Sequence, residues 1–292
     1  MRYAYYPGCV SQGACPELFK ATSVVAERLG LTLEHLREAS CTGAGVLQER
    51  DPELGDALNA RTLAMAEKKG LPLMTICSTC QGVIGQANMR LKADTEYRTF
   101  INRHLKPEGL EYHGTTEVKH FMWILVENIG LDQLKAMAKR SLNGTPLASF
   151  YGCYILRPSR KLGYEEHPER DTYLEKIILT LGGVPVDTWG KTKCCGFPLL
   201  TMNRDNSLKM AGTHLIEAKD KGADAMVTPC PLCHLNLDTA QPDAAALHKT
   251  QIGLPIIHLP QLIGMALGFD PRELGLNRHI IDTKAFTAKV PA

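Results

Sequence analysis

The stretch Lys193-Cys194-Cys195-Gly196-Phe197-Pro198 decides how the rest of the chain is interpreted. Forty residues separate Cys153 from the first thiol of this stretch, and thirty-four separate its second thiol from Cys230. A tetrahedral zinc site takes four ligands at most, whereas the several irons of an iron–sulfur cluster take thiolates. The pattern therefore predicts an iron–sulfur cluster bound by five thiols: Cys153, Cys194, Cys195, Cys230 and Cys233.

The same pattern occurs earlier in the chain with one thiol fewer. Cys41-Thr42-Gly43 and Cys77-Ser78-Thr79-Cys80 each lie 153 positions before their counterparts in the later pattern. The opening cysteines, Cys9 and Cys153, are 144 positions apart, so the second copy has nine extra residues in its first spacer. Similarity at a fixed distance indicates an internal repeat.

Each copy alternates short apolar runs with longer helical patterns. Strands are expected at 2–6, 31–33, 73–76 and 118–121 in the first copy, and at 148–151, 185–187, 225–228 and 255–258 in the second. Helices are expected at 18–29, 52–69, 78–91, 172–181, 207–219 and 261–267. Strands that alternate with helices predict a parallel sheet in each copy. The polar, irregular tail after Phe269 is expected to lie on the surface or to contact a partner.

The fold class follows from this order. We expect an α/β protein with two similar, Rossmann-like, parallel-sheet halves related by a pseudo-twofold axis. The boundary is expected near residue 140, giving domains 1–140 and 141–292, because 132–147 has the composition of a junction. Ligands of parallel sheets collect at the carboxyl ends of the strands, so the cysteine loops of both halves should face a shared cleft.

Composition limits the classes of function. A hydrophobic content of 44% and a charged content of 22% are typical of a globular protein, and a net charge of +2 gives no reason to expect nucleic acid. The start of the chain has no apolar signal region and no run is long enough to span a membrane, so we predict a cytoplasmic location, where disulfides are disfavoured. Phosphate-binding glycine motifs for nicotinamide cofactors or ATP are missing.

The spacing Cys-x40-Cys-Cys-x34-Cys-x2-Cys, with glycine after the pair, resembles the cysteine-rich CCG domain found in the B subunit of heterodisulfide reductase. The resemblance covers nearly the whole chain. It implies that the five thiols of 141–292 bind a non-cubane [4Fe-4S] cluster, which would serve as the reactive centre, and that 1–140 is a degenerate CCG domain with Cys41-Thr42 in place of the pair.

The first copy offers four matching thiols: Cys9, Cys41, Cys77 and Cys80. Four thiolates suit a [2Fe-2S] cluster, a [4Fe-4S] cube or a structural zinc, and these alternatives stay open. The tenth cysteine, Cys15, has no counterpart in the second copy. It is expected to be a small buried residue, with replacement of the missing ligand as the less favoured alternative.

Two histidines, His120 and His258, occupy matched positions after apolar strands. Metal ligation is one interpretation. A histidine at a strand end more often forms a hydrogen bond with a backbone carbonyl, which is the interpretation we favour.

Two functions compete. In the family, two facing clusters each give one electron to a disulfide, so the resemblance implies an oxidoreductase subunit that acts on disulfide, persulfide or protein-bound (lipoyl) thiols in sulfur metabolism. It also implies a ferredoxin-like iron–sulfur subunit and a flavoprotein as partners, with a lipoate-binding protein as a further one, as in the heterodisulfide-reductase-like complexes of sulfur-oxidising organisms. The alternative is an electron-relay subunit of a respiratory dehydrogenase of the succinate, glycolate, lactate or glycerol-3-phosphate type.

Overall fold

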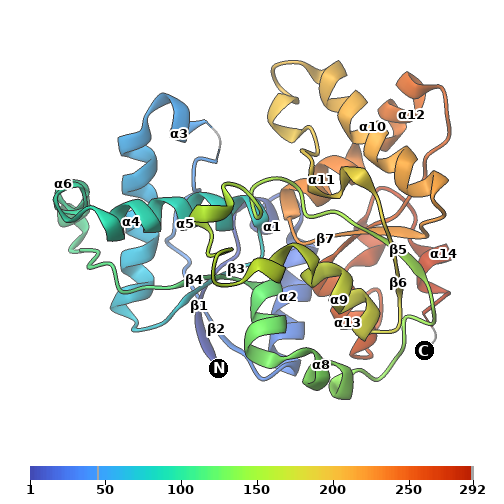
Figure 1. The fold of residues 1–292 in the computed structure, drawn as a ribbon, viewed down its shortest axis with the longest axis horizontal. Helices are drawn as coiled ribbons and strands as arrows, with labels where there is room; N and C mark the ends of the chain where they lie inside the picture. The colour runs from blue at the N-terminus through green and yellow to red at the C-terminus, as the bar shows by residue number, and fades with distance from the viewer. Residues whose placement is uncertain (45, 291–292) are drawn as a thin grey trace.

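The computed structural model describes residues 1–44 and 46–290, and within them lie two four-stranded parallel sheets (Figure 1). The strand order is β2-β1-β3-β4 in the first sheet and β6-β5-β7-β8 in the second, so the two halves share one topology. The strands are β1 (Arg2–Tyr6), β2 (Thr32–His35), β3 (Leu73–Thr75), β4 (Val118–His120), β5 (Pro146–Ser149), β6 (Val184–Val186), β7 (Ala225–Thr228) and β8 (Ile256–His258). The predicted α/β fold with two similar halves is confirmed.

Helices connect the strands in both halves. Those of the first half are α1 (Cys9–Gln12), α2 (Pro16–Arg28), α3 (Leu47–Arg50), α4 (Pro52–Lys68), α5 (Ser78–Ala93), α6 (Thr95–Leu105), α7 (Phe121–Trp123) and α8 (Leu131–Met137). Those of the second half are α9 (Tyr173–Thr180), α10 (Arg204–Asp220), α11 (Pro231–Thr239), α12 (Gln241–His248), α13 (Leu259–Ala266) and α14 (Lys284–Thr287). Helical crossovers of this kind are what parallel strands require, since the chain must return to the start of the next strand.

Local chemistry sets where these helices begin. Asp51 accepts a hydrogen bond from the amide of Leu54 at 3.0 Å, and Pro52 occupies the first turn of α4. An acidic cap followed by proline is a strong start signal, because the cap satisfies a free amide and proline has no amide to satisfy. At α5 the cap is a thiol, since Cys77 Sγ accepts from the amide of Cys80 at 3.5 Å. The second half repeats the Cys-x2-Cys helix start at α11.

Two buried hydrophobic clusters contain residues of both halves. One of them contains Tyr5 and Val25 from the first half together with Ile177, Ile257 and Ile263 from the second, all of them buried. Helix α2 packs against α13, α7 and α8 pack against α9, and α1 contacts α11, so helices of the two halves contact each other in several places. The halves therefore lie side by side as one packed body (Figure 1).

The sequence pattern does not indicate two features of the fold. The junction contains a helix, α8. The C-terminal tail does not lie wholly on the surface, because Leu274, Leu276 and Phe286 are buried within it. Its backbone amides at 280 and 281 donate to Asp238, which helps to hold the tail against α11.

Candidate metal centre

The four thiols of the first half lie at the carboxyl ends of its strands. Cys9 follows β1, Cys41 lies in the loop after β2, and Cys77 and Cys80 follow β3 at the start of α5. The Sγ atoms of Cys9 and Cys41 are 3.6 Å apart. All four thiols line a cavity of about 350 Å³, whose wall also includes Phe197, Pro231 and Leu232 of the second half.

The five thiols of the second half are arranged in the same way. Cys153 follows β5, Cys194 and Cys195 lie in the loop after β6, and Cys230 and Cys233 follow β7 at the start of α11. Cys153 and Cys194 are half-buried, whereas Cys195, Cys230 and Cys233 are buried. All ten cysteines of the chain are free thiols in the structure.

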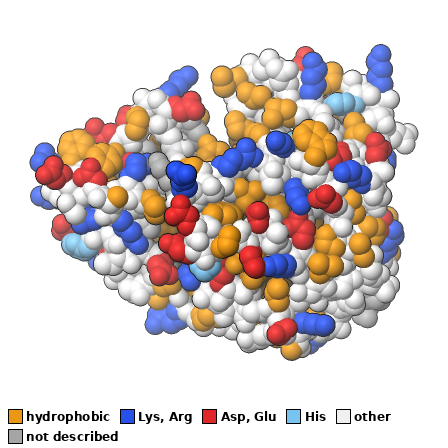
Figure 2. Space-filling view, in the orientation of Figure 1, with side chains coloured by type: hydrophobic (Ala, Val, Ile, Leu, Met, Phe, Trp, Pro, Cys, Tyr) orange, Lys and Arg blue, Asp and Glu red, His pale blue; other side chains and the backbone are white. Residues whose placement is uncertain are grey.

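The two groups of thiols adjoin each other. The Sγ atom of Cys77 lies 3.9 Å from that of Cys230, its equivalent in the other half. Thr79 Oγ1 lies 3.5 Å from the same Cys230 sulfur. The predicted shared cleft is thus present: the surface is hollowed between the lobe that carries α3 and α4 and the lobe that carries α10 (Figure 2).

Two histidines, one from each half, form hydrogen bonds that hold the two groups of thiols next to each other. His120, at the end of β4, makes a 3.0 Å hydrogen bond to the carbonyl of Pro229 in the other half. His258, at the end of β8, makes the equivalent 3.3 Å bond to the carbonyl of Ile76. Each carbonyl belongs to the residue before a Cys-x2-Cys pair. The expectation that these histidines bond to backbone carbonyls is confirmed, and the exchange is reciprocal, as a pseudo-twofold relation requires.

Glycine lets the backbone approach the sulfur atoms closely. Gly8 has φ +82° and Gly152 has φ +72°, a region that other residues rarely adopt. A Cβ at Gly152 would lie 2.9 Å from Cys233 Sγ, and one at Gly8 would lie 3.2 Å from Cys80 Sγ. Both halves therefore use a glycine in the position where a side chain would fill the space beside the thiols.

Proton sharing between thiols moves their pKa values apart. A hydrogen bond with Cys9 lowers the pKa of Cys41 to about 6. Hydrogen bonds led by that with Cys153 lower the pKa of Cys194 far below the ordinary range of a thiol. Each half thus has a thiol with a lowered pKa, exposed Cys41 and half-buried Cys194, and a lowered pKa favours the thiolate, which is the form that binds metal.

The donor set fits an iron–sulfur cluster better than a single ion. Among residues 1–44 and 46–290, no three His, Cys, Asp or Glu side chains are grouped so that they could hold one metal ion. A mononuclear tetrahedral site needs its donors around one point, whereas each iron of a cluster takes its own thiolate. The four first-half thiols around one cavity, beside a glycine that leaves space, suit the larger group.

Residue 42 marks the difference between the halves. Thr42 is buried, with 3% of its surface exposed, at the position of the equally buried Cys195. Asn59 donates to the carbonyl of Thr42 at 3.3 Å, and Asn236 donates to that of Cys195 at 2.8 Å. The fold thus holds both positions in place, although only one carries a thiol.

Cys15 lies apart from the other thiols. It is buried, and burial followed by the nearby carboxylates Glu17 and Asp238 raises its pKa to about 12. Its charged surroundings are those of the C-terminal tail, where Arg278 pairs with Glu17. The favoured interpretation of Cys15, a small buried residue at a helix start, agrees with this position.

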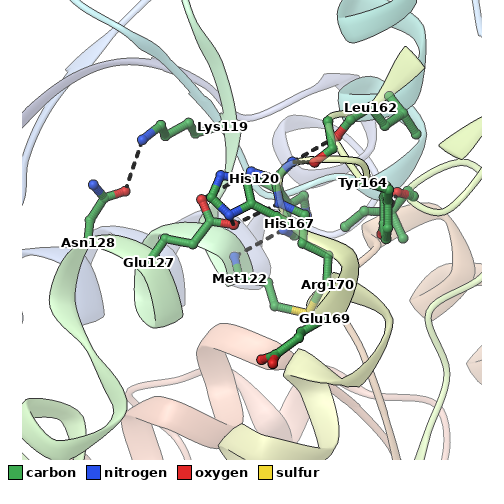
Figure 3. Close-up of polar contacts among 12 residues, drawn as sticks. Lys119, His120, Met122, Glu127, Asn128, Leu162, Tyr164, His167, Glu169 and Arg170 are labelled. Atoms are coloured by element: carbon green, nitrogen blue, oxygen red, sulfur yellow. Dashed lines mark hydrogen bonds and ion pairs between the residues drawn. The ribbon is translucent and has the colours of Figure 1, made fainter. Parts of the chain in front are cut away.

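An arginine that the sequence pattern does not single out lies beside the Cys153 loop. Arg170 is buried and forms a bidentate ion pair with Glu127 (Figure 3). Its guanidinium lies 3.8 Å from the ring centre of Trp123. One feature of the sequence could have indicated such a contact: the second spacer is nine residues longer than the first. An inserted segment beside a site needs a contact that holds it in place. Nothing in the local sequence names the partner, because Glu127 is 43 positions away.

Both halves match a single family. Residues 3–85 and residues 147–238 match the cysteine-rich domain family CCG, so this chain belongs to that family.

Relatives align over nearly the whole chain. It is 38% identical to the 8-methylmenaquinol:fumarate reductase membrane anchor subunit of Wolinella succinogenes, over 96% of this chain and 97% of that one. It is 33% identical to the B subunit of the ferredoxin/F(420)H(2)-dependent CoB-CoM heterodisulfide reductase of Methanosarcina acetivorans, over 99% and 97%. It is 30% identical to a protein of Archaeoglobus profundus that is named as similar to the B subunit of heterodisulfide reductase, over 94% and 93%.

A solved structure shares the fold. A hypothetical protein from Helicobacter pylori superposes with a TM-score of 0.80 at 18% identity, and the match covers 96% of this chain and 52% of that one. This chain therefore spans about half of that protein. Among the described residues, no helix is both long and apolar enough to span a bilayer. Together the family and its relatives support an iron–sulfur cluster and a subunit associated with an oxidoreductase.

Proposed function

We propose that this chain is the cysteine-rich subunit of a multisubunit oxidoreductase and performs redox chemistry on sulfur: on a disulfide, a persulfide or a protein-bound lipoyl thiol. The observation that supports the proposal is the 3.9 Å approach of Cys77 Sγ and Cys230 Sγ, which brings the two groups of thiols, the proposed metal ligands, next to each other. A disulfide takes up two electrons, and two adjacent one-electron centres can deliver them without releasing a free radical. Similarity to the B subunit of heterodisulfide reductase supports the same function.

The residues of each half have separate tasks in this proposal. Cys153, Cys194, Cys195, Cys230 and Cys233 would hold a non-cubane [4Fe-4S] cluster as the reactive centre. Cys9, Cys41, Cys77 and Cys80 would hold a second iron–sulfur cluster, [4Fe-4S] or [2Fe-2S], or a zinc ion. When bound, an iron–sulfur cluster supplies single electrons and an iron that can accept a sulfur ligand. The domains would be 1–140 and 141–292.

The cavity between the halves suits a binding site for the sulfur substrate of such a reaction. Val10, Leu47, Phe197 and Leu232 contribute apolar surface around the first-half thiols. Apolar walls exclude water, which strengthens electrostatic interactions within the site and protects reactive sulfur. Electrons would enter or leave through a ferredoxin-like subunit and a flavoprotein, and a lipoate-binding protein is the proposed carrier of a lipoyl substrate.

A second function is favoured by one specific observation. The relative at 38% identity is a subunit of a fumarate reductase, whose name refers to no sulfur substrate. In that case the two metal groups would relay electrons and bind no sulfur substrate. The short distance between them would then serve only electron transfer. The two functions predict the same iron content and differ in their response to a thiol.

The test uses the anaerobically reconstituted full chain. After oxidation, a small dithiol is added and the EPR spectrum is recorded, with the S-methylated form of the same compound as the matched probe that cannot bind as a thiolate. Sulfur chemistry predicts a new or shifted signal with the dithiol alone. A protein with full iron content and no dithiol-dependent change would instead be an electron relay.

A further inference from the structure

The segment 153–172 distinguishes the second half from the first. It begins at Cys153 and includes the nine residues by which the second spacer exceeds the first. In place of a direct return to the sheet, the segment leaves its own half and lies against α5 of the first half. A Cβ at Gly82 would meet the carbonyl oxygen of Tyr154 at 2.4 Å, and one at Gly85 would meet Leu162 Cδ2 at 3.2 Å.

This contact connects the two groups of thiols. Helix α5 begins directly after Cys77 and includes Cys80, and Gly82 lies two residues further along the same helix. The backbone it touches, at Tyr154, is one residue after Cys153. Any movement of segment 153–172 away from α5 would therefore move the Cys153 backbone relative to the thiols of the first half.

Arg170 anchors the far end of this segment. Its Nε donates to Glu127 Oε1 at 2.7 Å and its Nη2 donates to Oε2 at 3.1 Å, while Nη1 donates to the carbonyl of Leu162 at 2.8 Å. Glu127 belongs to a π-helical turn, η2 (Ile124–Ile129), of the first half. Both side chains are almost fully buried, with 7% and 10% exposed. Figure 3 shows Arg170 bonded both to Leu162, which belongs to segment 153–172, and to Glu127, which belongs to the first half.

Aromatic side chains connect Arg170 with the backbone near Cys153. The guanidinium of Arg170 lies 3.8 Å from the centre of Trp123, and Trp123 meets Tyr164 edge to face at a centroid distance of 6.5 Å. The Tyr164 hydroxyl donates to the carbonyl of Ile155 at 3.0 Å. Ile155 is two residues from Cys153, so these contacts fix the segment at both ends.

We propose that Arg170 is a positioning residue for the second metal site: it holds segment 153–172 against the first half and thereby sets where Cys153 lies relative to the thiols of both halves. The inference rests on the proposed function, because Cys153 is a proposed ligand there. Arg170 touches no thiol and acts only through the segment. Lysine cannot replace it, since a single ammonium group cannot pair with a carboxylate at two points and also reach the Leu162 carbonyl.

The experiment compares the reconstituted full chain with its Arg170→Gln and Arg170→Lys variants, and with Arg160→Gln, which removes an exposed arginine of the same segment. Iron release to a chelator is followed for each site, with the second-site signal identified by its loss in Cys195→Ser. Loss of a supporting contact around a metal ligand typically weakens metal binding by about 10-fold or more, so second-site iron should be released about 10-fold faster in both Arg170 variants. First-site iron and Arg160→Gln should behave like the parent.

Hydrogen exchange gives a second readout that a merely global loss of stability would not reproduce. Amides of residues 155–170 should exchange faster in Arg170→Gln, while those of β5 and β7 keep their protection. Should this variant fail to fold, Glu127→Gln tests the same contact, because it keeps the side-chain shape and one acceptor, and the same direction of change is expected.

Three results can be told apart. If Cys195→Ser loses its second-site iron while Arg170→Gln keeps parental release and exchange, the inference about Arg170 is wrong and the proposed function stands. If Cys195→Ser keeps all of its iron, the proposed ligand set is wrong and the inference falls with it. Faster exchange throughout the chain, with equal iron release from both sites, would overturn the inference, because Arg170 would then support the fold as a whole.

Discussion

The two halves of the chain have the same strand order and nearly the same thiol positions, yet they differ at the centre of the site. The first half has Thr42 where the second has Cys195, and both residues are buried. Their backbone carbonyls are held by asparagines from different helices, Asn59 of α4 and Asn236 of α11. A repeat can thus preserve a position in space while its chemistry and its supporting contacts change.

The halves also differ in how their first cysteine is held. Cys9 follows β1 directly and is exposed, with α1 continuing the chain over four residues. Cys153 is half-buried and opens a long segment that is fastened to the other half by Arg170. The second site is therefore built with residues of both halves, and four sets of substitutions test how far this asymmetry extends.

The largest expected effect comes from Cys195→Ser. The variant should lose the iron and acid-labile sulfide of the second site, about four iron atoms per chain if that site holds a [4Fe-4S] cluster. Thr42→Ser, a small change at the equivalent position, should keep parental iron. Elemental analysis of both reconstituted variants checks the prediction. Equal iron in the parent and in Cys195→Ser would show that the halves do not differ through this thiol.

The converse substitution is Thr42→Cys. It adds a fifth thiol to the first half at a buried position whose backbone is already held by Asn59. The expected outcome is a first-site EPR signal that becomes similar to that of the second site, with iron content equal to or above the parent. A spectrum unchanged from the parent would show that the number of thiols alone does not determine the kind of metal group.

Removing either cross-half histidine should affect both halves alike. His120→Ala and His258→Ala each leave a buried carbonyl without its partner, a loss of about 1–3 kcal/mol in the free energy of unfolding. His→Gln at either position keeps a donor and should cost less. Urea unfolding of the iron-loaded protein measures the loss. A large effect in only one variant would contradict the reciprocal arrangement.

The smallest difference is expected between the two glycines. Gly8→Ala and Gly152→Ala each force a left-handed backbone on alanine, at a cost of about 1–2 kcal/mol in stability. The added methyl would lie closer to sulfur at Gly152, 2.9 Å, than at Gly8, 3.2 Å. Gly152→Ala should therefore also perturb the second-site spectrum more than Gly8→Ala perturbs the first. If the two variants change the spectra of their sites equally and lose equal stability, both glycines would matter only for the backbone conformation and not for the space beside the sulfur atoms.

Much of the fold can be predicted because its signals are local or repeated. The strands expected at 2–6 and 225–228 have those bounds in the structure, and the offset of 153 positions between the cysteine motifs relates the two sheets. Helices whose pattern is weak, such as α8 at the junction, escape prediction. The stability of α8 comes from packing against distant residues: the amide of Lys139, just after this helix, donates to the carbonyl of Ala266 at 2.8 Å.

The sequence indicates which thiols form each half of the site, but it does not indicate how the two halves come together. Cysteine spacing indicates which thiols belong together, because metal ligands leave a pattern along the chain. The approach of Cys77 to Cys230 and the anchoring by Arg170 depend on how the halves pack, which spacing does not encode. The expectation that the tail lies on the surface or contacts a partner misses its buried residues for the same reason, since a polar composition hides the buried Phe286.

The interlocked core has a consequence for how such a chain can be divided. Cutting it near residue 140 would uncover the apolar faces of α2 and α13, which cover each other in the intact protein. A fragment of 141–292 would thus be expected to self-associate, and sedimentation would reveal it as a dimer. Two identical copies facing one another would present five thiols on each side.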